Sequence, residues 1–542
     1  MLKHILILTS ICSFAFGQNV FTNTADKAKI ELAKQKMYAG QYVSAVNSLE
    51  EITKTSPNDA NVYYYMGNCN YMLSKYDKAK ENLNKSISLN PNKAAAHFVL
   101  GKILQREEKY DEAITEFNLC ATNSKSGDAD NQDATVFISQ CNTAKKLIAS
   151  PVDVEIINAG DINSKYDDKN PCVTADGSLL VFTTRRPENV GSAVDVEGDG
   201  KYFEDIYFAA FDTSVHKFAN AKAVPGSVNT NGHDACTSIS PDGKQMFLYK
   251  NDMNDKMSRG GDVFVSKINS GKWKTPEQYG KPVASTYWEG GACISPDGKR
   301  LFFTSERKGG LGGSDIWMIE KISKKEWGKP VNLGAPINSI YDEGGMFLAP
   351  DGKTLFFCSN GPTSIGSYDI FKTVLENGKW SAPMNLGYPI NSSGKEGQLS
   401  ISANGKTAYF SSERAGGMGE SDIYMINLKD YAILEKDNKL KMNDGLSILK
   451  GTVRDGYEGY GVAEVEIIIS DANGTQVAST NTNENGEYFL TLKGGQNYKI
   501  DVKKKGFQEI SETIELKLGA KETVTLEKGV FAKEIIFFKR TL

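Results

Sequence analysis

A unit that recurs five times between residues 152 and 428 constrains the fold more than any other feature of the chain. Each unit contains an Asp-Gly or Asn-Gly pair flanked by alternating apolar segments such as RLFF and TLFF. These pairs begin at Asp176, Asp242, Asp297, Asp351 and Asn404. Such a pair between two alternating segments is a strong signal for a β-hairpin. Each unit is therefore expected to contain one hairpin.

A third and a fourth strand are expected after each hairpin. The third strand follows a Gly-rich turn and opens with an aspartate: Asp205, Asp262, Asp315, Asp369 and Asp422. The fourth strand is represented by segments such as PVNLGAPIN, but the fifth unit ends at SDIYMINL without one. An equivalent segment, VEIINAGDIN, stands at 154–163, before the first unit. We expect this strand to complete the last unit and to close a β-propeller of five blades.

The motif SPDGKxLxFxS followed by SDIY resembles the WD40-like (PD40) repeats of the TolB-type propeller family. The resemblance is most specific in units three to five and covers roughly half of the chain. It implies a five-bladed β-propeller over residues 151–428.

The residues before this region repeat with a shorter period, of 34 residues. The recurring positions are Tyr42, Tyr76 and Tyr110; Ala45, Ala79 and Ala113; and Gly67 with Gly101. The helical spacing of the apolar residues predicts stacked helix pairs. The pattern resembles the tetratricopeptide repeat family, with Ala33 where the first unit should have glycine, and implies an α-helical solenoid over 25–149 that ends in a capping helix. Such stacks expose a groove that binds proteins, although a packing spacer is the alternative.

A charged linker at 429–446 is followed by short alternating strands with Gly and Asn turns, which predict a small β-sandwich over 447–527. Gly451, Gly461, the run Asn485 to Tyr488, and Gly506 resemble the carboxypeptidase regulatory-like domain, a non-catalytic module. A strand-like tail occupies 528–542.

The N-terminus has the features of a signal peptide over 1–17. Lys3 precedes an apolar run, and Ala15-Phe16-Gly17 forms a cleavage site before Gln18. Acylation at Cys12 is the competing interpretation, but Ile11 stands where that cleavage needs a small residue. No other apolar stretch approaches the roughly 20 residues that span a bilayer.

Composition excludes several classes of protein. Lys and Arg number 63 and Asp and Glu 67, so the chain has no basic excess that would indicate nucleic-acid binding. Seven cysteines follow the signal peptide without any CxxC spacing, which argues against a disulfide framework and a zinc site. Cys120 and Cys141, on neighbouring predicted helices, are the only pair worth testing for a bridge.

One carboxylate stands eight residues before each hairpin turn. The five are Asp168, Asp234, Glu289, Glu343 and Glu396. In a propeller, equivalent positions on the innermost strands would gather these acids at one end of the channel, where they would need a cation or a basic partner. A metal or basic-peptide site is one interpretation. The other is that each carboxylate binds backbone amides of its own or the next blade, which recurrence in every unit favours.

Two further segments suggest bound ions. The glycines of GGLGGSD invite a phosphate-loop interpretation, but Ser314 and Asp315 open a strand and no helix follows, so we expect a turn. Asp195, Glu197 and Asp199 are spaced as in the first half of a calcium loop. Ile206 stands where a true EF-hand has its bidentate Glu. A calcium-stiffened loop and a solvated acidic turn both remain open.

Motifs for catalysis are scarce in the sequence. Neither HExxH nor GxSxG occurs, so zinc peptidase and α/β-hydrolase chemistry lack their residues. His233, beside Asp234, is the one histidine that suggests a function, and His97 is explained by helix packing. We expect no catalytic residues and no cofactor other than the calcium considered above.

The order of these modules resembles a group of bacterial envelope proteins that usually end in an OmpA-like peptidoglycan-binding domain, including the peptidoglycan-anchoring subunit of type IX secretion. The present sequence ends at Leu542, where that domain would begin, so peptidoglycan binding is not implied. The resemblance implies an exported, non-enzymatic scaffold at the periplasmic side of the outer membrane, with partners on the solenoid groove and the propeller face. The alternatives are a glycan- or peptide-binding sensor and a hydrolase that uses the acidic ring.

Overall fold

The computed structural model describes residues 25–125, 129–190, 193–251, 261–269, 271–323, 326–428, 433, 445–455, 459–507, 509–516 and 530–538. The expected signal peptide with Cys12 and most of the expected linker lie outside these residues. The chain divides into two compact units. The first comprises Met1–Lys146 with Ala193–Tyr202, and the second comprises Leu147–Ser192 with Phe203–Leu542.

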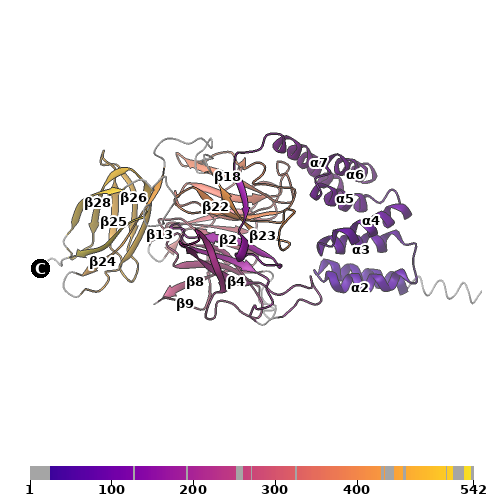
Figure 1. The fold of residues 1–542 in the computed structure, drawn as a ribbon, viewed down its shortest axis with the longest axis horizontal. Coiled ribbons are helices and arrows are strands. Elements are labelled where there is room, and N and C mark those ends of the chain that lie inside the picture. Colours follow the sequence, from indigo (N-terminus) through magenta and orange to yellow (C-terminus); the bar gives the residue numbers. More distant parts are fainter. Residues whose placement is uncertain are drawn as a thin grey trace, which may run out of the picture. The chain divides into compact units, whose positions relative to one another are not determined.

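The first unit is built from consecutive helices, drawn in indigo and purple in Figure 1. Residues 25–38 form the first of them. The others are α2 (Tyr42–Thr53), α3 (Ala60–Met72), α4 (Tyr76–Leu89), α5 (Ala94–Arg106), α6 (Tyr110–Asn123) and α7 (Ala129–Ile148). Helix α3 packs on α4, α5 packs on α6, and α3 also contacts α5. These are the stacked, tetratricopeptide-like helix pairs that the 34-residue period predicts. None of the described helices combines the length and the apolar character needed to span a membrane.

Small residues at the recurring positions allow the two helices of a pair to approach closely. A Cβ atom on Gly67 would lie 2.7 Å from Cγ of Leu83, and one on Gly101 would lie 2.6 Å from Cε1 of Phe117. Both distances are shorter than any normal carbon contact, so these positions need glycine while the partner side chains stay in place. The recurring alanines are also buried: Ala45, Ala79 and Ala113.

His97 of α5 makes two hydrogen bonds through its ring nitrogens. Its Nδ1 lies 2.6 Å from a carboxylate oxygen of Glu116, and its Nε2 lies 2.8 Å from the carbonyl oxygen of Pro91. Both partners are acceptors, so the ring satisfies them by donating from both nitrogens, which requires the imidazolium form. The hydrogen bond to Glu116 raises the pKa of His97 above its usual value, against the opposing effect of burial.

The second unit contains five antiparallel sheets in chain order, coloured from magenta to orange in Figure 1. The first sheet has β2 (Asp168–Val173), β3 (Leu179–Thr184), β4 (Asp205–Asp212) and β5 (Lys217–Ala223). The second has β6 (His233–Ile239), β7 (Gln245–Asn251), β8 (Asp262–Asn269), β9 (Lys272–Trp273) and β10 (Glu277–Gln278). The third has β11 (Glu289–Ile294), β12 (Arg300–Ser305), β13 (Asp315–Ser323), β14 (Glu326–Trp327) and β15 (Val331–Asn332).

The fourth and fifth sheets continue this pattern. The fourth has β16 (Glu343–Leu348), β17 (Thr354–Ser359), β18 (Asp369–Glu376), β19 (Lys379–Trp380) and β20 (Met384–Asn385). The fifth has β21 (Glu396–Ile401), β22 (Thr407–Ser412), β23 (Asp422–Asn427) and β1 (Glu155–Asn158), which comes from before the first sheet and is followed by a short 3-10 helix, Gly160–Ile162. Strand β1 pairs antiparallel with β23. The third strand of every sheet begins at the aspartate that the sequence predicts.

The five hairpins have the turns that their sequences require. The glycine of each Asp-Gly or Asn-Gly pair has a φ between 66° and 71°, a region that favours glycine. The first strands of the sheets also contact one another in a closed series: β2 with β6, β6 with β11, β11 with β16, β16 with β21, and β21 with β2. The first and fifth of these sheets therefore lie in contact.

The C-terminal part of the second unit has two sheets, drawn in yellow in Figure 1. One consists of β24 (Leu446–Asp455), β27 (Glu487–Lys493) and β30 (Val530–Phe538). The other consists of β25 (Glu466–Ser470), β26 (Gln476–Asn481), β28 (Gln496–Lys503) and β29 (Ile510–Leu516). Apolar side chains of β24, β25, β27 and β28 form a common core that includes Leu449, Ile467, Leu490 and Ile500.

The tail expected at 528–542 contains a strand of its own. Strand β30 lies within 528–542 and pairs in parallel with β24, so the tail supplies a strand of the sandwich. The physical reason is that β24 would otherwise present an unpaired edge, with free backbone amides and carbonyls. Sequence alone shows the strand-forming residues of the tail but not their partner.

We expect the stability of the helical unit to fall as pH rises above about 6.5, because the folded pKa of His97 is raised. The contribution of the imidazolium is fully present below the unfolded pKa of about 6.5 and is lost as pH passes through the folded pKa. His97→Gln should cost about 1 to 2 kcal/mol at pH 5.5 and less at pH 9. Far-UV circular dichroism during urea unfolding of the full chain measures this. His216→Gln, at an exposed turn, is the control; an equal cost of His97→Gln at both pH values would contradict the account.

Candidate functional site

The five predicted carboxylates lie at or next to the first residue of the first strand of each sheet. Their exposed fractions are 0 to 1%. Each accepts hydrogen bonds from the backbone N–H and the hydroxyl of the residue four positions earlier, at 2.5 to 3.1 Å. These residues are Ser164, Thr230, Ser285, Ser339 and Ser392. The carboxylate therefore fixes the turn that leads into each first strand.

A cation completes four of the five networks. Nη2 of Arg307 lies 3.1 Å from Glu289, Nη2 of Arg414 lies 3.6 Å from Glu396, and Nη2 of Arg186 lies 2.9 Å from Asp168. In the second sheet, Nζ of Lys250 lies 2.6 Å from Asp234. The three arginines also donate to backbone carbonyls and lie over two aromatic rings each, at 4.6 to 5.8 Å. Each of the three arginine ion pairs is thus part of the packing of its sheet.

Glu343 in the fourth sheet is the exception. Gly361 stands at the position that an arginine occupies in the first, third and fifth sheets. The carboxylate of Glu343 accepts hydrogen bonds from Ser339 and, at 3.1 Å, from the hydroxyl of Ser359. Within the described part of the chain, Glu343 has no ion pair. Burial raises the pKa of Glu343 to about 7.

The aspartates that open the third strands hold the Gly-rich turns. The backbone N–H of Leu311, within GGLGGSD, donates to Asp315 at 2.5 Å, and Ile365 donates to Asp369 at 2.7 Å. Cβ atoms on Gly312 and Gly366 would lie 2.0 and 2.2 Å from backbone oxygens of the following loop, so these positions require glycine. The glycines therefore serve the turn, as the sequence predicts.

The geometry favours the structural interpretation of the five acids over a shared metal or peptide site. Each carboxylate is buried and accepts hydrogen bonds from the turn that leads into its own first strand; in the third, fourth and fifth sheets it also accepts one from a serine at the end of the second strand. Across the residues that have described positions, no group of three or more His, Cys, Asp and Glu side chains is arranged to hold a metal ion.

The acidic loop that resembles half of a calcium site belongs to the first unit. Asp195 accepts from the backbone N–H of Gly198 and Asp199 from that of Lys201, both at 2.9 Å. Glu197 accepts from the side-chain amide of Gln41 at 3.0 Å. These three carboxylates bind separate partners and do not converge on a common point.

His233 is paired with a residue that sequence reasoning missed. Its Nδ1 lies 3.2 Å from Glu204, and its ring meets that of Phe203 edge to face at 4.8 Å. Glu204 also pairs with Lys169 of β2, and the Lys169 ammonium and the hydrogen bond with His233 hold the pKa of Glu204 well below its usual value despite burial. No spacing in the sequence indicates this contact, because Glu204 belongs to the loop before β4 and His233 to the next sheet.

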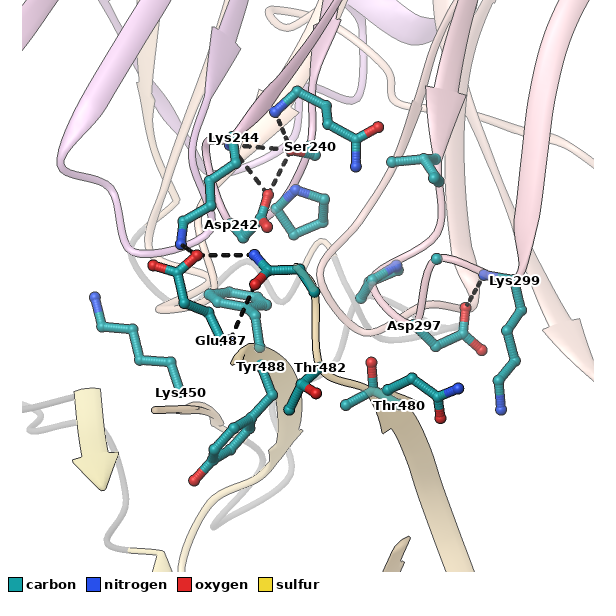
Figure 2. Close-up of a pocket in the computed structure, with 18 of the residues that line it drawn as sticks. Ser240, Asp242, Lys244, Asp297, Lys299, Lys450, Thr480, Thr482, Glu487 and Tyr488 are labelled. Atoms are coloured by element: carbon teal, nitrogen blue, oxygen red, sulfur yellow. Dashed lines mark hydrogen bonds and ion pairs between the residues drawn. The ribbon is translucent and has the colours of Figure 1, made fainter. Parts of the chain in front are cut away.

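A polar cleft of about 880 Å³ lies within the second unit, between the sandwich and the hairpin turns of the first three sheets. Figure 2 shows Lys244 reaching Glu487 across it, with Thr480 and Thr482 on the sandwich side. Nζ of Lys299 donates to the hydroxyl of Ser479 at 2.7 Å. The lining carries five acidic and five basic side chains, so its formal charge is balanced. The acids are Asp176, Asp242, Asp297, Glu464 and Glu487, and the bases are Lys244, Lys299, Lys321, Lys450 and Arg454.

The helical unit carries a different kind of surface on its first, third and fifth helices. Two rows of residues recur at the period of 34: Ile30, Tyr64 and Phe98 in one, and Lys34, Asn68 and Lys102 in the other. We call these six residues the two-row face. All six are half-buried, and the rows are one helical turn apart. The side chains of Asn68 and Met37 touch at 3.6 Å and α3 contacts α5, so the three helices are neighbours.

Comparisons with known proteins agree with two of the three predicted modules. The sequence model of the carboxypeptidase regulatory-like domain matches residues 448–527. The model of the family "anaphase-promoting complex, cyclosome, subunit 3" matches residues 39–119, within the helical repeats. No curated protein matches the chain significantly. The predictions of tetratricopeptide-like repeats and of a regulatory-like domain are confirmed.

Solved structures with helical repeats are similar to the N-terminal part. The tetratricopeptide domain of P58(IPK) is 22% identical over 23% of this chain and 34% of its own, with a TM-score of 0.22. MamA is 23% identical over 22% of this chain and 64% of its own, with a TM-score of 0.21. The Yersinia enterocolitica type III secretion chaperone SycD is 14% identical over 22% of this chain and 85% of its own, with a TM-score of 0.21.

We expect the charge state of Glu343 to make the sheets less stable as pH rises. The raised pKa means that the folded state binds more protons than the unfolded state between about pH 4.3 and 7, so stability falls over this range. Glu343→Gln should remove this slope and cost less than about 1 kcal/mol at pH 8. Urea unfolding monitored by tryptophan fluorescence at pH 5 and pH 8 measures the pH dependence of stability and the cost of the substitution.

Glu289→Gln is the matched control for this experiment. It leaves Arg307 buried without its carboxylate, and we expect a loss of about 3 kcal/mol at either pH. If Glu343→Gln is as costly as Glu289→Gln at pH 8, the difference in charge balance between the two sheets does not govern their stability.

Proposed function

We propose that the chain is an exported, non-enzymatic protein-protein interaction scaffold of the bacterial envelope. The observation that carries the proposal is the two-row face, because aromatic and basic side chains that stay half-buried on neighbouring repeat helices are suited to contact another protein. The propeller face is a second surface for partners. Association with the outer membrane or with type IX secretion is part of the proposal and rests on the order of the modules.

The proposal includes a five-bladed WD40-like β-propeller over residues 151–428. Two observations support it: the closed series of contacts among the first strands, and the pairing of β1 with β23. This pairing joins the earliest strand of the region to the latest, which leaves no open end between the first and last sheets. A closed ring of this kind offers a rigid face to a partner.

A non-enzymatic role agrees with the state of the acidic residues. A pair of catalytic carboxylates needs at least one oxygen that can reach a substrate. Here the carboxylates bind the residues that shape their own sheets, and four of them face a cation. Their number and position are therefore explained by the fold.

Partner capture tests the scaffold. The full chain is used as bait in bacterial envelope extracts, next to a variant that carries Tyr64→Ala and Tyr65→Ala; the ring of Tyr65 lies 5.0 Å from that of Tyr64. We expect the double variant to lose at least nine-tenths of the captured partner, quantified by mass spectrometry. Tyr63→Ala is the matched control, because this neighbouring tyrosine lies near Lys85 of α4, 6.0 Å from its ring. Undiminished capture by the double variant would reject the two-row face as the partner site.

The alternative function is a sensor that binds a glycan, and the polar cleft is the observation that favours it. Its balanced charge and its many hydroxyl and amide groups suit a neutral, hydroxyl-rich ligand. A glycan array probed with the full chain tests this, with Asn481→Ala expected to weaken any signal at least fivefold. A chain that retains no glycan, or a signal that Asn481→Ala leaves unchanged, excludes the cleft as such a site.

A further inference from the structure

The acidic loop, residues 193–202, packs on a helix from a distant part of the sequence. It lies between β3 and β4 of the first sheet in the chain, yet it belongs to the helical unit. The backbone N–H of Val43 donates to the carbonyl oxygen of Gly198 at 3.0 Å, and that of Ser44 donates to the carbonyl oxygen of Glu197 at 3.3 Å. Val43 and Ser44 are the second and third residues of α2. The acidic loop therefore contacts the first turn of this helix.

The first turn of α2 lacks the usual features that stabilise the start of a helix. The first four N–H groups of an α-helix have no carbonyl partner within it, and the side chain of the N-cap residue often accepts from the second or third. Among the described residues, the N-cap of α2 is Gln41, which makes no such bond, and the first turn contains no acidic side chain. The carbonyl oxygens of the acidic loop bind the second and third N–H groups instead.

The corresponding helices of the other two repeats carry acids of their own. Asp77 of α4 and Asp111 of α6 stand 34 and 68 residues after Val43, in the first turns of their helices. A negative charge is favourable there because the N-terminal end of a helix is the positive end of its dipole. In α2 this charge comes from the acidic loop, since the Glu197 carboxylate accepts from the side-chain amide of Gln41 at 3.0 Å. The loop thus supplies what the first repeat lacks.

Contacts within the acidic loop hold it in the shape that this role requires. Val194 and Tyr202 form an antiparallel bridge at its base. The Asp195 carboxylate accepts from the N–H of Gly198, and the N–H of Asp195 donates to the carbonyl oxygen of Lys201, both at 2.9 Å. A Cβ atom on Gly198 would lie 1.9 Å from Oδ2 of Asp195, so the turn requires glycine. The spacing that resembles a calcium loop is therefore explained by a closed turn that presents two carbonyl oxygens to α2.

We propose that the acidic loop is the N-terminal cap of α2, and that the stability of the first repeat consequently depends on the first sheet, from which the loop extends. Leu49 of α2 shares a buried cluster with Ala33 of the preceding helix. Loss of the cap would therefore loosen both helices of the first repeat, which carries Ile30 and Lys34 of the two-row face. The inference concerns contacts within the chain and does not depend on the partner proposed above.

Hydrogen–deuterium exchange of the full chain, measured by mass spectrometry, tests the cap. In one variant, Gly-Ser-Gly-Ser-Gly replaces residues 195–199, which removes the shape and the charge of the loop but keeps its length. We expect the start of α2 to exchange at least threefold faster, because an uncapped first turn opens more often, while α4 and α6 are unchanged. Adding Val43→Asp gives α2 the acid that α4 has and should restore at least half of the lost protection.

Val43→Pro tests the same contact from the side of the helix. Proline has no N–H, and a helix makes no internal hydrogen bond with the N–H at this position, so the substitution removes the donor to Gly198. We expect the acidic loop to exchange at least threefold faster in this variant. Asp77→Pro is the matched control, because it alters the same position of α4 and should leave exchange of the acidic loop unchanged.

Asp205, which opens β4 just after the loop, tests the dependence on the first sheet. Its carboxylate accepts from the N–H of Val190 at 2.6 Å and so anchors the segment that leads into the loop. Asp205→Ala should therefore raise exchange at the start of α2 at least twofold. Asp369→Ala changes the same position of the fourth sheet and should leave α2 as it is.

Any of four results would overturn the inference. Replacing the loop could leave exchange of α2 unchanged, or Val43→Asp could restore no protection. The two proline variants could affect the acidic loop equally, or the two alanine variants could affect α2 equally. Complete loss of the helical circular dichroism signal when the loop is replaced would also contradict it, because a cap of this kind acts on one helix end.

Discussion

The five-sheet region depends on a buried carboxylate at the start of each first strand. An ionised group in a protein interior is tolerated only when hydrogen bonds and opposite charge replace water. Here the replacement comes from a hydroxyl and an N–H four residues earlier and, in three sheets, from an arginine eighteen residues later. One side chain thereby joins the entering turn, the first strand and the end of the second. The arginine extends this network to the aromatic rings that fill the sheet.

Variation among the sheets shows which parts of this network are required. The turn contacts with Ser or Thr occur in all five sheets, whereas the cation is an arginine in three, Lys250 in one, and replaced by Gly361 in the fourth. The hydrogen bonds therefore define the unit, and the ion pair adjusts its charge balance. A buried carboxylate without a cation must accept a raised pKa, and Glu343 has one. The raised pKa of Glu343 thus follows from the packing of its sheet.

The helical unit uses small residues to obtain a similar result. Gly67 and Gly101 lie against Leu83 and Phe117, so the two helices of each pair approach closely. The two-row face carries half-buried aromatic and basic residues, and the Lys102 ammonium lies among three aromatic rings. Interaction with another protein is a use to which such a face is suited.

Repetition is what made the local structure predictable from sequence. The Asp-Gly turns, the aspartates that open the third strands, and the glycines and alanines of the helix pairs each recur at fixed intervals, and their conformational requirements are local. The contact of Glu204 with His233 and Lys169, the pairing of β30 with β24, and the aromatic surroundings of Lys102 could not be predicted. Each joins residues from different elements with no common spacing. The sequence by itself determined the repeat units and their turns, because steric and hydrogen-bonding preferences act over a few residues. Only the tertiary structure decided which charges are matched, because that depends on which side chains distant in the chain come to share a low-dielectric environment.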